Sequence, residues 1–182
     1  SLWYFFFFSL LFFSSYLMKT LNILGKEKYF YLKRFSVFSF SYLLLVGIIT
    51  QTIKHLVGRP RPNHSQLGGG FEFNFFSTES SLHSFPSGHT STIIAITIIM
   101  ALAIPNLRYF FYFFSFLIAL SRVVVGAHFL NDVIGGVIIA IIVYKFFDYF
   151  IKIKYPDIHW GSLKISNIQV VTKVLIICFI IS

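Results

Sequence analysis

Long apolar runs separated by short polar segments dominate this chain. Five of the runs approach or reach the length that a helix needs to cross a bilayer, and they lie at residues 2–18, 35–53, 90–104, 109–125 and 128–147. The pattern predicts an all-α, polytopic membrane helix bundle with about five to six transmembrane helices. We expect residues 1–167 to form a single transmembrane domain. The tail 168–182 is apolar but short, so a truncated extra span, an interfacial helix and a packed tail all stay open.

Composition supports a membrane protein. Hydrophobic residues make up 57% of the chain and charged residues only 12%, well below the roughly one quarter that is usual for soluble domains. The net charge of +9 would indicate a nucleic-acid partner in a soluble chain. In a membrane protein this charge follows from topology, so we expect the bilayer, and no nucleic acid, as the partner.

The distribution of Lys and Arg predicts the orientation. Alternating spans place the polar loop 54–89 and the turn at 122–128 on one side of the membrane, where only four Lys or Arg residues lie, against ten on the other side. The positive-inside rule makes the side with ten residues cytoplasmic. We therefore expect a multi-pass protein of the cytoplasmic (inner) membrane whose long loop faces the periplasm or the exterior.

The first polar motif begins at the end of the second apolar run, with Lys54, Arg59 and Arg61. Cations at a helix end can simply anchor it at the interface. These, however, lie on the side that should be poor in positive charge, and Pro60 and Pro62 restrict the backbone around them. The pattern indicates an anion-binding site.

The second motif is Pro86-Ser87-Gly88-His89, where the loop meets the third apolar run. Ser87 is a candidate N-cap, and one alternative is that the motif serves only to start a helix. Gly88, however, lets a ligand approach the backbone, and free N–H groups at a helix start bind phosphate. His89 would then lie in the first turn, beside a bound anion.

The third motif contains Arg122, Gly126, His128 and Asp132. If His128 and Asp132 share a helix, their i, i+4 spacing puts them on one face within hydrogen-bond reach. A histidine held by a carboxylate is a candidate nucleophile or base. Alternatively, Arg122 and Asp132 form an ion pair that only holds two helices together.

In order and internal spacing, these three motifs resemble the signature motifs of the type-2 phosphatidate phosphatase superfamily. That group includes membrane lipid phosphatases and soluble vanadium haloperoxidases, and the resemblance covers roughly residues 35–147. It implies an all-helical bundle and a mechanism without metal or cofactor. Membrane members resemble a six-span bundle with three spans before the long loop. Only two precede it here, so we expect the first helix of the family to be missing.

The resemblance implies a role for each matching residue. His128 would attack phosphorus to form a phosphohistidine, Asp132 would hold its imidazole in the right tautomer, and His89 would protonate the leaving oxygen. The expected phosphate-binding residues are Lys54, Arg61, Ser87, Gly88 and Arg122. Arg59 falls inside the variable spacing of its motif and receives no role.

These features predict a lipid phosphatase acting at the outer face of the cytoplasmic membrane. Polyprenyl diphosphate, lipid A 1-phosphate, phosphatidylglycerol phosphate and phosphatidate all fit as substrates. One alternative is a non-catalytic binder or transporter of phospholipid that uses the same anion pocket. Another is a metallohydrolase in which His89, His128 and Asp132 ligate a metal. The sequence leaves the head group and the oligomeric state open.

Overall fold

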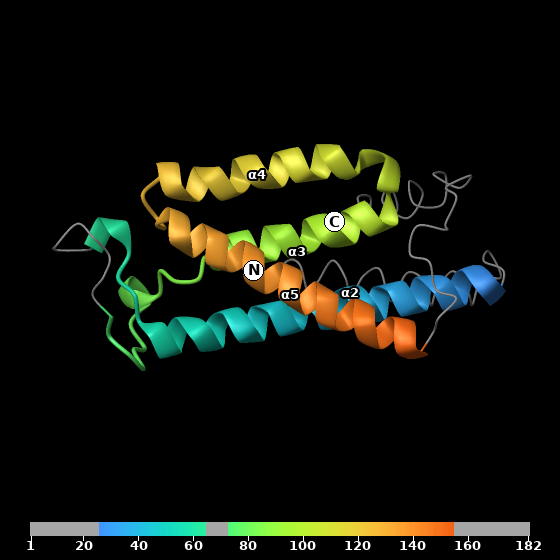
Figure 1. The fold of residues 1–182 in the computed structure, drawn as a ribbon, viewed down its shortest axis with the longest axis horizontal. Coiled ribbons are helices and arrows are strands. Elements are labelled where there is room, and N and C mark those ends of the chain that lie inside the picture. The colour runs from blue at the N-terminus through green and yellow to red at the C-terminus, as the bar shows by residue number, and fades with distance from the viewer. Residues whose placement is uncertain (1–25, 65–72, 155–182) are drawn as a thin grey trace, which may run out of the picture. The chain divides into compact units, whose positions relative to one another are not determined.

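The computed structural model describes residues 26–64 and 73–154, which are mainly helical (Figure 1). This part of the chain forms four α-helices and contains no strand. The helices are α2 (Lys26–Val57), α3 (Gly88–Ala103), α4 (Arg108–Val124) and α5 (Leu130–Lys154), and three short 3-10 helices are η1 (Pro62–His64), η2 (Ser80–Leu82) and η3 (Pro105–Leu107). The all-α class is therefore confirmed over these residues. The predicted span 2–18 and the tail 168–182 lie outside them, so the count of five to six helices is not confirmed.

Three helical segments are long and apolar enough to cross a membrane: Lys33–Val57, Pro105–Val124 and Leu130–Lys154. The remaining helix, α3, is apolar but has only 16 residues. α3 ends at Ala103, and η3 begins two residues later at Pro105, a residue that cannot continue an α-helix. These lengths and compositions are typical of a membrane protein.

Helix boundaries differ from the apolar runs where charged residues continue a helix. α2 begins at Lys26 rather than at residue 35, because the lysines and the glutamate before the apolar run are good helix formers. α5 continues past residue 147 to Lys154. There Lys152 Nζ lies 2.7 Å from Asp148 Oδ2, an i, i+4 ion pair on an exposed helical surface.

The chain divides into two compact units. One contains Ser1–Ser41 and Ser162–Ser182, and its described part is the first half of α2. The other, Tyr42–Gly161, contains the second half of α2 and the helices α3, α4 and α5. All three polar motifs belong to the second unit.

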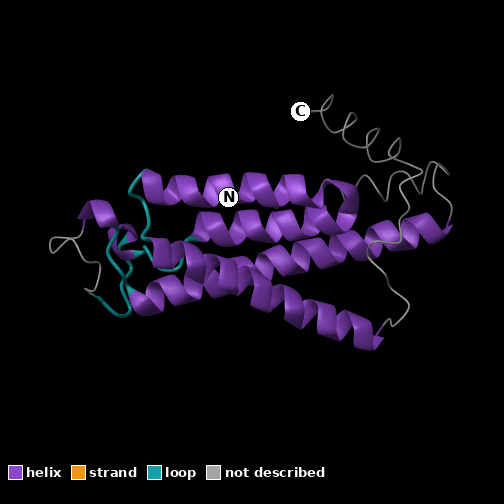
Figure 2. Ribbon diagram, turned by 45° about the horizontal axis from the view of Figure 1, so that its top comes forward, coloured by secondary structure: helices purple, strands orange, loops and turns teal. Residues whose placement is uncertain are grey.

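Within the second unit, α3 packs against both α4 and α5 (Figures 1 and 2). Polar contacts join α2 to the other helices: Tyr42 Oη donates to the Ala140 carbonyl at 2.8 Å, and Thr50 Oγ1 donates to Ser91 Oγ at 3.1 Å. The buried apolar side chains of this unit include Tyr42, Leu43, Val46, Ala95, Ile99, Ala119, Val133, Ile139, Ala140 and Val143. Small residues among them allow the helices to approach closely, as is common in membrane bundles.

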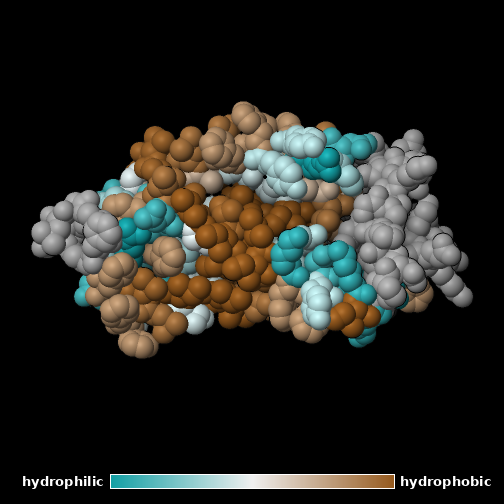
Figure 3. All heavy atoms as spheres, in the orientation of Figure 1, coloured by the Kyte–Doolittle hydropathy of each residue, from teal (hydrophilic) through white to brown (hydrophobic). Residues whose placement is uncertain are grey.

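The outer surface of the helices is apolar. Figure 3 shows a band of hydrophobic side chains over α4 and α5, with hydrophilic residues toward the helix ends. On α4 the exposed apolar side chains include Phe110, Phe113, Phe114, Phe116, Leu117 and Ile118. An apolar band of this extent is suited to contact with lipid chains.

Candidate active site

The three motifs meet at one end of the second unit, where α2 ends, α3 begins and α4 turns into α5 (Figure 1). Two connecting segments lie against each other there: Arg61 N donates to the Ser81 carbonyl at 3.1 Å, and Ser84 N donates to the Arg59 carbonyl at 2.9 Å. The first motif is thereby tied to the residues that precede the second.

Ser87 caps the start of α3, which confirms the expected helix cap. Its Oγ accepts a hydrogen bond from Thr90 N at 3.4 Å. The Ser87 N–H donates to the backbone carbonyl of Asp132 at 2.9 Å. Ser87 is fully buried. The N-cap thus joins the start of α3 directly to the first turn of α5.

Two glycines of α5 allow this close contact between the helices. A Cβ at Gly136 would lie 2.7 Å from the Ser87 carbonyl oxygen and 3.1 Å from Ser91 N. A Cβ at Gly135 would lie 2.6 Å from the ring of Phe85. Real Cβ atoms essentially never lie within 3.0 Å of such a neighbouring atom. The glycine pair therefore fixes how closely the second motif approaches α5.

The turn between α4 and α5 is folded around Arg122. Its backbone carbonyl accepts hydrogen bonds from Ala127 N at 3.1 Å and from His128 N at 3.2 Å. Gly126 adopts a φ of +70°, which suits glycine, and a Cβ there would lie 2.6 Å from Asn63 Oδ1. Because α5 begins only at Leu130, His128 precedes the helix, and the helical i, i+4 geometry expected for His128 and Asp132 is not found.

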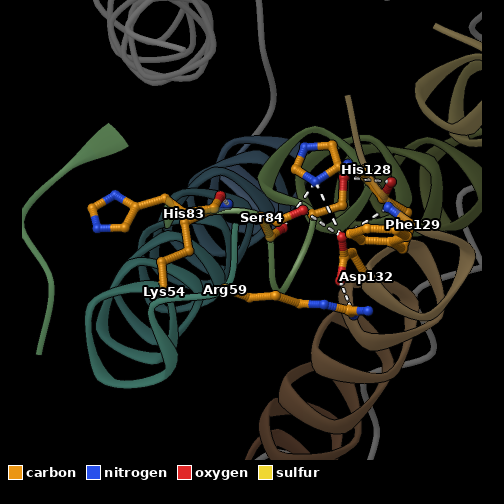
Figure 4. Close-up of polar contacts among 9 residues, drawn as sticks. Lys54, Arg59, His83, Ser84, His128, Phe129 and Asp132 are labelled. Atoms are coloured by element: carbon orange, nitrogen blue, oxygen red, sulfur yellow. Dashed lines mark hydrogen bonds and ion pairs between the residues drawn. The ribbon is translucent and has the colours of Figure 1, made fainter. Parts of the chain in front are cut away.

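His128 is buried, and its ring is oriented by a backbone carbonyl (Figure 4). Its Nδ1 lies 2.8 Å from the Ser84 carbonyl oxygen and 3.8 Å from Asp132 Oδ2. The longer distance exceeds hydrogen-bond range. Since a carbonyl only accepts, Nδ1 carries the proton, and in the neutral ring Nε2 keeps its lone pair.

Asp132 is fully buried and receives three hydrogen bonds at its carboxylate. Oδ1 accepts from Arg59 Nη1 at 2.6 Å, and Oδ2 accepts from Ser84 Oγ at 2.5 Å and from Phe129 N at 2.9 Å. The bond from Phe129 N satisfies the N–H of the residue just before α5, as the acidic member of a capping box does. The alternative in which Asp132 pairs with Arg122 is not found, because the carboxylate forms a buried ion pair with Arg59 instead.

Sequence reasoning missed Arg59 and Ser84. The Arg59 guanidinium lies 4.4 Å from the centroid of the Phe129 ring, and the residue is 6% exposed. Arg59 shares with Lys54 and Arg61 the position on the cation-poor side, and this signal could have found it. Ser84 carries no comparable signal, since a lone serine before a Phe-Pro pair is ordinary in a loop.

The predicted phosphate-binding cations surround the same end of α3. Lys54 is buried, and its Nζ donates to the His83 carbonyl at 2.6 Å. A Cβ at Gly88 would lie 3.4 Å from Lys54 Cε, so the lysine stem passes beside the helix start. Arg61 Nε is buried and has no hydrogen-bond partner among the described residues. Arg122 donates from Nε and Nη2 to Ser121 Oγ, at 3.2 Å in each case.

His89 lies in this cationic surrounding, ahead of the predicted apolar run 90–104. Partial burial lowers its pKa below the ordinary value, and neighbouring basic groups lower it further. In decreasing order of effect, these groups are Arg122, His128, Lys54 and Arg61. Because they come from the first and third motifs, the structure brings all three motifs together around the His89 imidazole.

A metal site in this part of the molecule would need several His, Cys, Asp or Glu side chains close together. Among residues 26–64 and 73–154, no group of three or more His, Cys, Asp or Glu side chains is placed to hold a metal ion. The carboxylate of Asp132 is surrounded by hydrogen-bond donors, one of them the Arg59 cation.

Comparison with known proteins matches residues 35–155 to the model of the PAP2 superfamily. A lipid A 1-phosphatase of Rhizobium etli is 34% identical over 120 residues, which cover 66% of this chain and 51% of the relative. A lipid A 1-phosphatase of Rhizobium johnstonii is 35% identical over 120 residues, covering 66% and 48%. The chain therefore spans about half the length of these curated relatives. No solved structure shows a significant match.

Proposed function

Because this chain belongs to the PAP2 superfamily, we propose that it is an integral-membrane lipid phosphatase that works through a phosphohistidine intermediate. The substrate is a phosphomonoester or diphosphate of a membrane lipid. The site residues are the eight that the sequence indicated: His128, His89 and Asp132 for catalysis, and Lys54, Arg61, Ser87, Gly88 and Arg122 for phosphate binding.

One observation carries this proposal: three cations and two histidines from separate motifs converge at the start of α3. Lys54, Arg61 and Arg122 supply positive charge for the phosphoryl oxygens, and Arg61 Nε is a donor that has no acceptor among the residues the structure describes. Positive groups fixed in advance around a phosphoryl centre stabilise the charge of its transition state.

In the first step, His128 Nε2 attacks phosphorus and the bond from phosphorus to the lipid oxygen breaks. The proton on Nδ1 stays hydrogen-bonded to the Ser84 carbonyl, which keeps the lone pair on Nε2. The positive charge that develops on the ring is stabilised by the Asp132 carboxylate, 3.8 Å from Nδ1. His89 donates its proton to the leaving oxygen.

In the second step, the now neutral His89 takes a proton from water. The resulting hydroxide attacks phosphorus, the bond between phosphorus and Nε2 breaks, and phosphate leaves. His89 is thereby returned to its protonated form, and no metal or cofactor takes part.

For the substrate, the curated relatives named lipid A 1-phosphatase make lipid A 1-phosphate the first candidate. Polyprenyl diphosphate, phosphatidylglycerol phosphate and phosphatidate remain in the set to be tested. The lipid tail would stay in the bilayer against the apolar helices, while the phosphate enters the site from the outer face of the cytoplasmic membrane.

The test is phosphate release by the purified protein in detergent from a panel of these four lipid phosphates. We expect turnover of at least one lipid, and we expect His128→Ala to lower kcat/KM by about 10³-fold or more, since it removes the nucleophile. His159→Ala, which changes a histidine outside the motifs, is the matched control and should retain full activity.

Two outcomes would contradict the proposal. Binding of lipid phosphate without turnover would favour the non-catalytic binder or transporter. Loss of activity on treatment with a chelator, with recovery on addition of a divalent metal, would favour the metallohydrolase. We expect instead that activity survives the chelator and that vanadate, a phosphate analogue, inhibits it.

A further inference from the structure

The Asp132 carboxylate has no direct hydrogen bond to the histidine that it is expected to orient. Its Oδ1 is bonded to Arg59 Nη1, and its Oδ2 accepts from Ser84 Oγ and Phe129 N. The separation of 3.8 Å between Oδ2 and His128 Nδ1 permits electrostatic attraction, but it is too long to fix the plane or the tautomer of the ring.

Ser84 connects the two groups. Its hydroxyl donates to Asp132 Oδ2 at 2.5 Å, and its backbone carbonyl accepts from His128 Nδ1 at 2.8 Å. Ser84 is fully buried, so water does not compete for either bond. Figure 4 shows Ser84 between the imidazole and the carboxylate.

Arg59 also binds Ser84, through its main chain. Its backbone carbonyl accepts from Ser84 N at 2.9 Å, while its guanidinium is paired with Asp132 and lies over the Phe129 ring. The amide of Ser84 is thus bound to the main chain of Arg59, and its hydroxyl to the carboxylate that Arg59 neutralises.

Resting on the proposed function, we propose that Ser84 and Arg59 are positioning residues for the nucleophile, through which Asp132 acts on His128. The carboxylate fixes the Ser84 hydroxyl, the serine main chain presents its carbonyl to Nδ1, and this carbonyl selects the tautomer with a free Nε2. Arg59 keeps the buried carboxylate charged and in place. Neither residue touches the phosphate in this arrangement.

The test combines kinetics with ¹⁵N NMR of histidine-labelled protein in detergent. We expect Ser84→Ala to lower kcat by about 10- to 100-fold through misplacement of the nucleophile, with KM changed less than about threefold because the phosphate-binding cations are untouched. We also expect a fall in the fraction of His128 protonated at Nδ1. Ser115→Ala is the matched control, because within the described part of the chain this buried serine on α4 bonds to the Tyr112 carbonyl of its own helix and to no other group.

A second pair of variants tests the proposal even if the Ser84→Ala protein fails to fold. Arg59→Gln leaves the carboxylate uncompensated, whereas Arg59→Lys retains the charge, so Lys should preserve more of kcat and more of the Nδ1-protonated form than Gln. A wild-type kcat and tautomer in Ser84→Ala, or equal kcat and tautomer effects of Lys and Gln at position 59, would overturn the proposal.

The NMR readout separates this inference from the proposed function. If the wild-type protein released no phosphate from any lipid, the proposed function would fail, but a loss of the Nδ1-protonated form in Ser84→Ala would still support positioning by Ser84. Conversely, a normal tautomer in an active Ser84→Ala variant would overturn the positioning role alone.

Discussion

At the scale of single residues, the pKa of His89 is a measure of the electrostatics of the site. Burial and the four neighbouring basic groups lower this pKa in the free protein, so the ring is more often neutral near pH 7 than a solvent-exposed histidine. A bound dianion cancels much of this positive potential and stabilises the imidazolium, which raises the pKa.

We therefore predict that anion binding is accompanied by proton uptake at His89. Sulfate is the suitable probe, because it mimics phosphate and does not itself ionise in this range. Calorimetry of sulfate binding near pH 7, in two buffers with different ionisation enthalpies, should show uptake of a fraction of a proton. His89→Gln should bind sulfate with clearly less uptake, and equal uptake in both proteins would contradict the assignment.

The residues of the site differ in how visible they are in the sequence. Charged groups such as Lys54, Arg122 and Asp132 stand out because charge is rare in apolar helices. The link through Ser84 does not, because it depends on contacts between residues 44 and 48 positions apart. Arg59 is visible as a charge, but the motif pattern treats its position as variable and so gives it no role.

At the scale of elements, the close packing of α3 on α5 sets the distance between His89, at the start of α3, and His128, which precedes α5. The carbonyl oxygen of the Ser87 cap lies only 2.7 Å from where a Cβ of Gly136 would be, and the cap precedes His89 by two residues. A methyl group at position 136 must push the start of α3 away from α5, since backbone cannot yield as a flexible side chain does.

Gly136→Ala is accordingly expected to lower kcat/KM by about 10²-fold, because small displacements of catalytic groups cost this much. Gly47→Ala on α2 is the matched control, since a Cβ there has nothing within 4 Å. That control should keep its activity and gain up to about 1 kcal/mol of helix stability. Retention of full activity by Gly136→Ala would show that the contact is not needed for catalysis.

Element boundaries were predictable where local signals exist. The Ser87 cap, the Pro105 break and the Gly126 turn follow from residue type, and the structure has all three. The start of α5 was placed at residue 128, whereas the helix begins at Leu130. Phe129 and His128 are apolar or aromatic and fit the run, so only the hydrogen bond from Phe129 N to the Asp132 side chain reveals the true start.

At the scale of the whole molecule, the positive-inside rule predicts that the loop 54–89 faces outward. Ser80 is exposed in this loop, and Lys152 is exposed near the end of α5. The single native cysteine, Cys178, can be replaced by serine, so that Ser80→Cys and Lys152→Cys each provide one unique thiol.

With a membrane-impermeant maleimide, we expect Ser80→Cys to be labelled in intact spheroplasts and Lys152→Cys to be labelled only after permeabilisation. The reverse pattern would place the active site on the cytoplasmic side. Labelling of both thiols in detergent is the control for reactivity.

The shortness of α3 has a consequence for how a substrate is selected. Its 16 residues span only about 24 Å at 1.5 Å per residue, less than the roughly 30 Å of a hydrocarbon core. If the Pro105 end of α3 reaches one boundary of that core, His89 lies some 6 Å beneath the other. The reacting phosphorus then has to sink below the plane of the neighbouring head groups. We expect the site to select substrates by the depth of their phosphate in the membrane. A phosphate joined directly to the sugar or glycerol nearest the acyl chains reaches the depth of His89. A phosphate at the end of a longer polar linker stays above it.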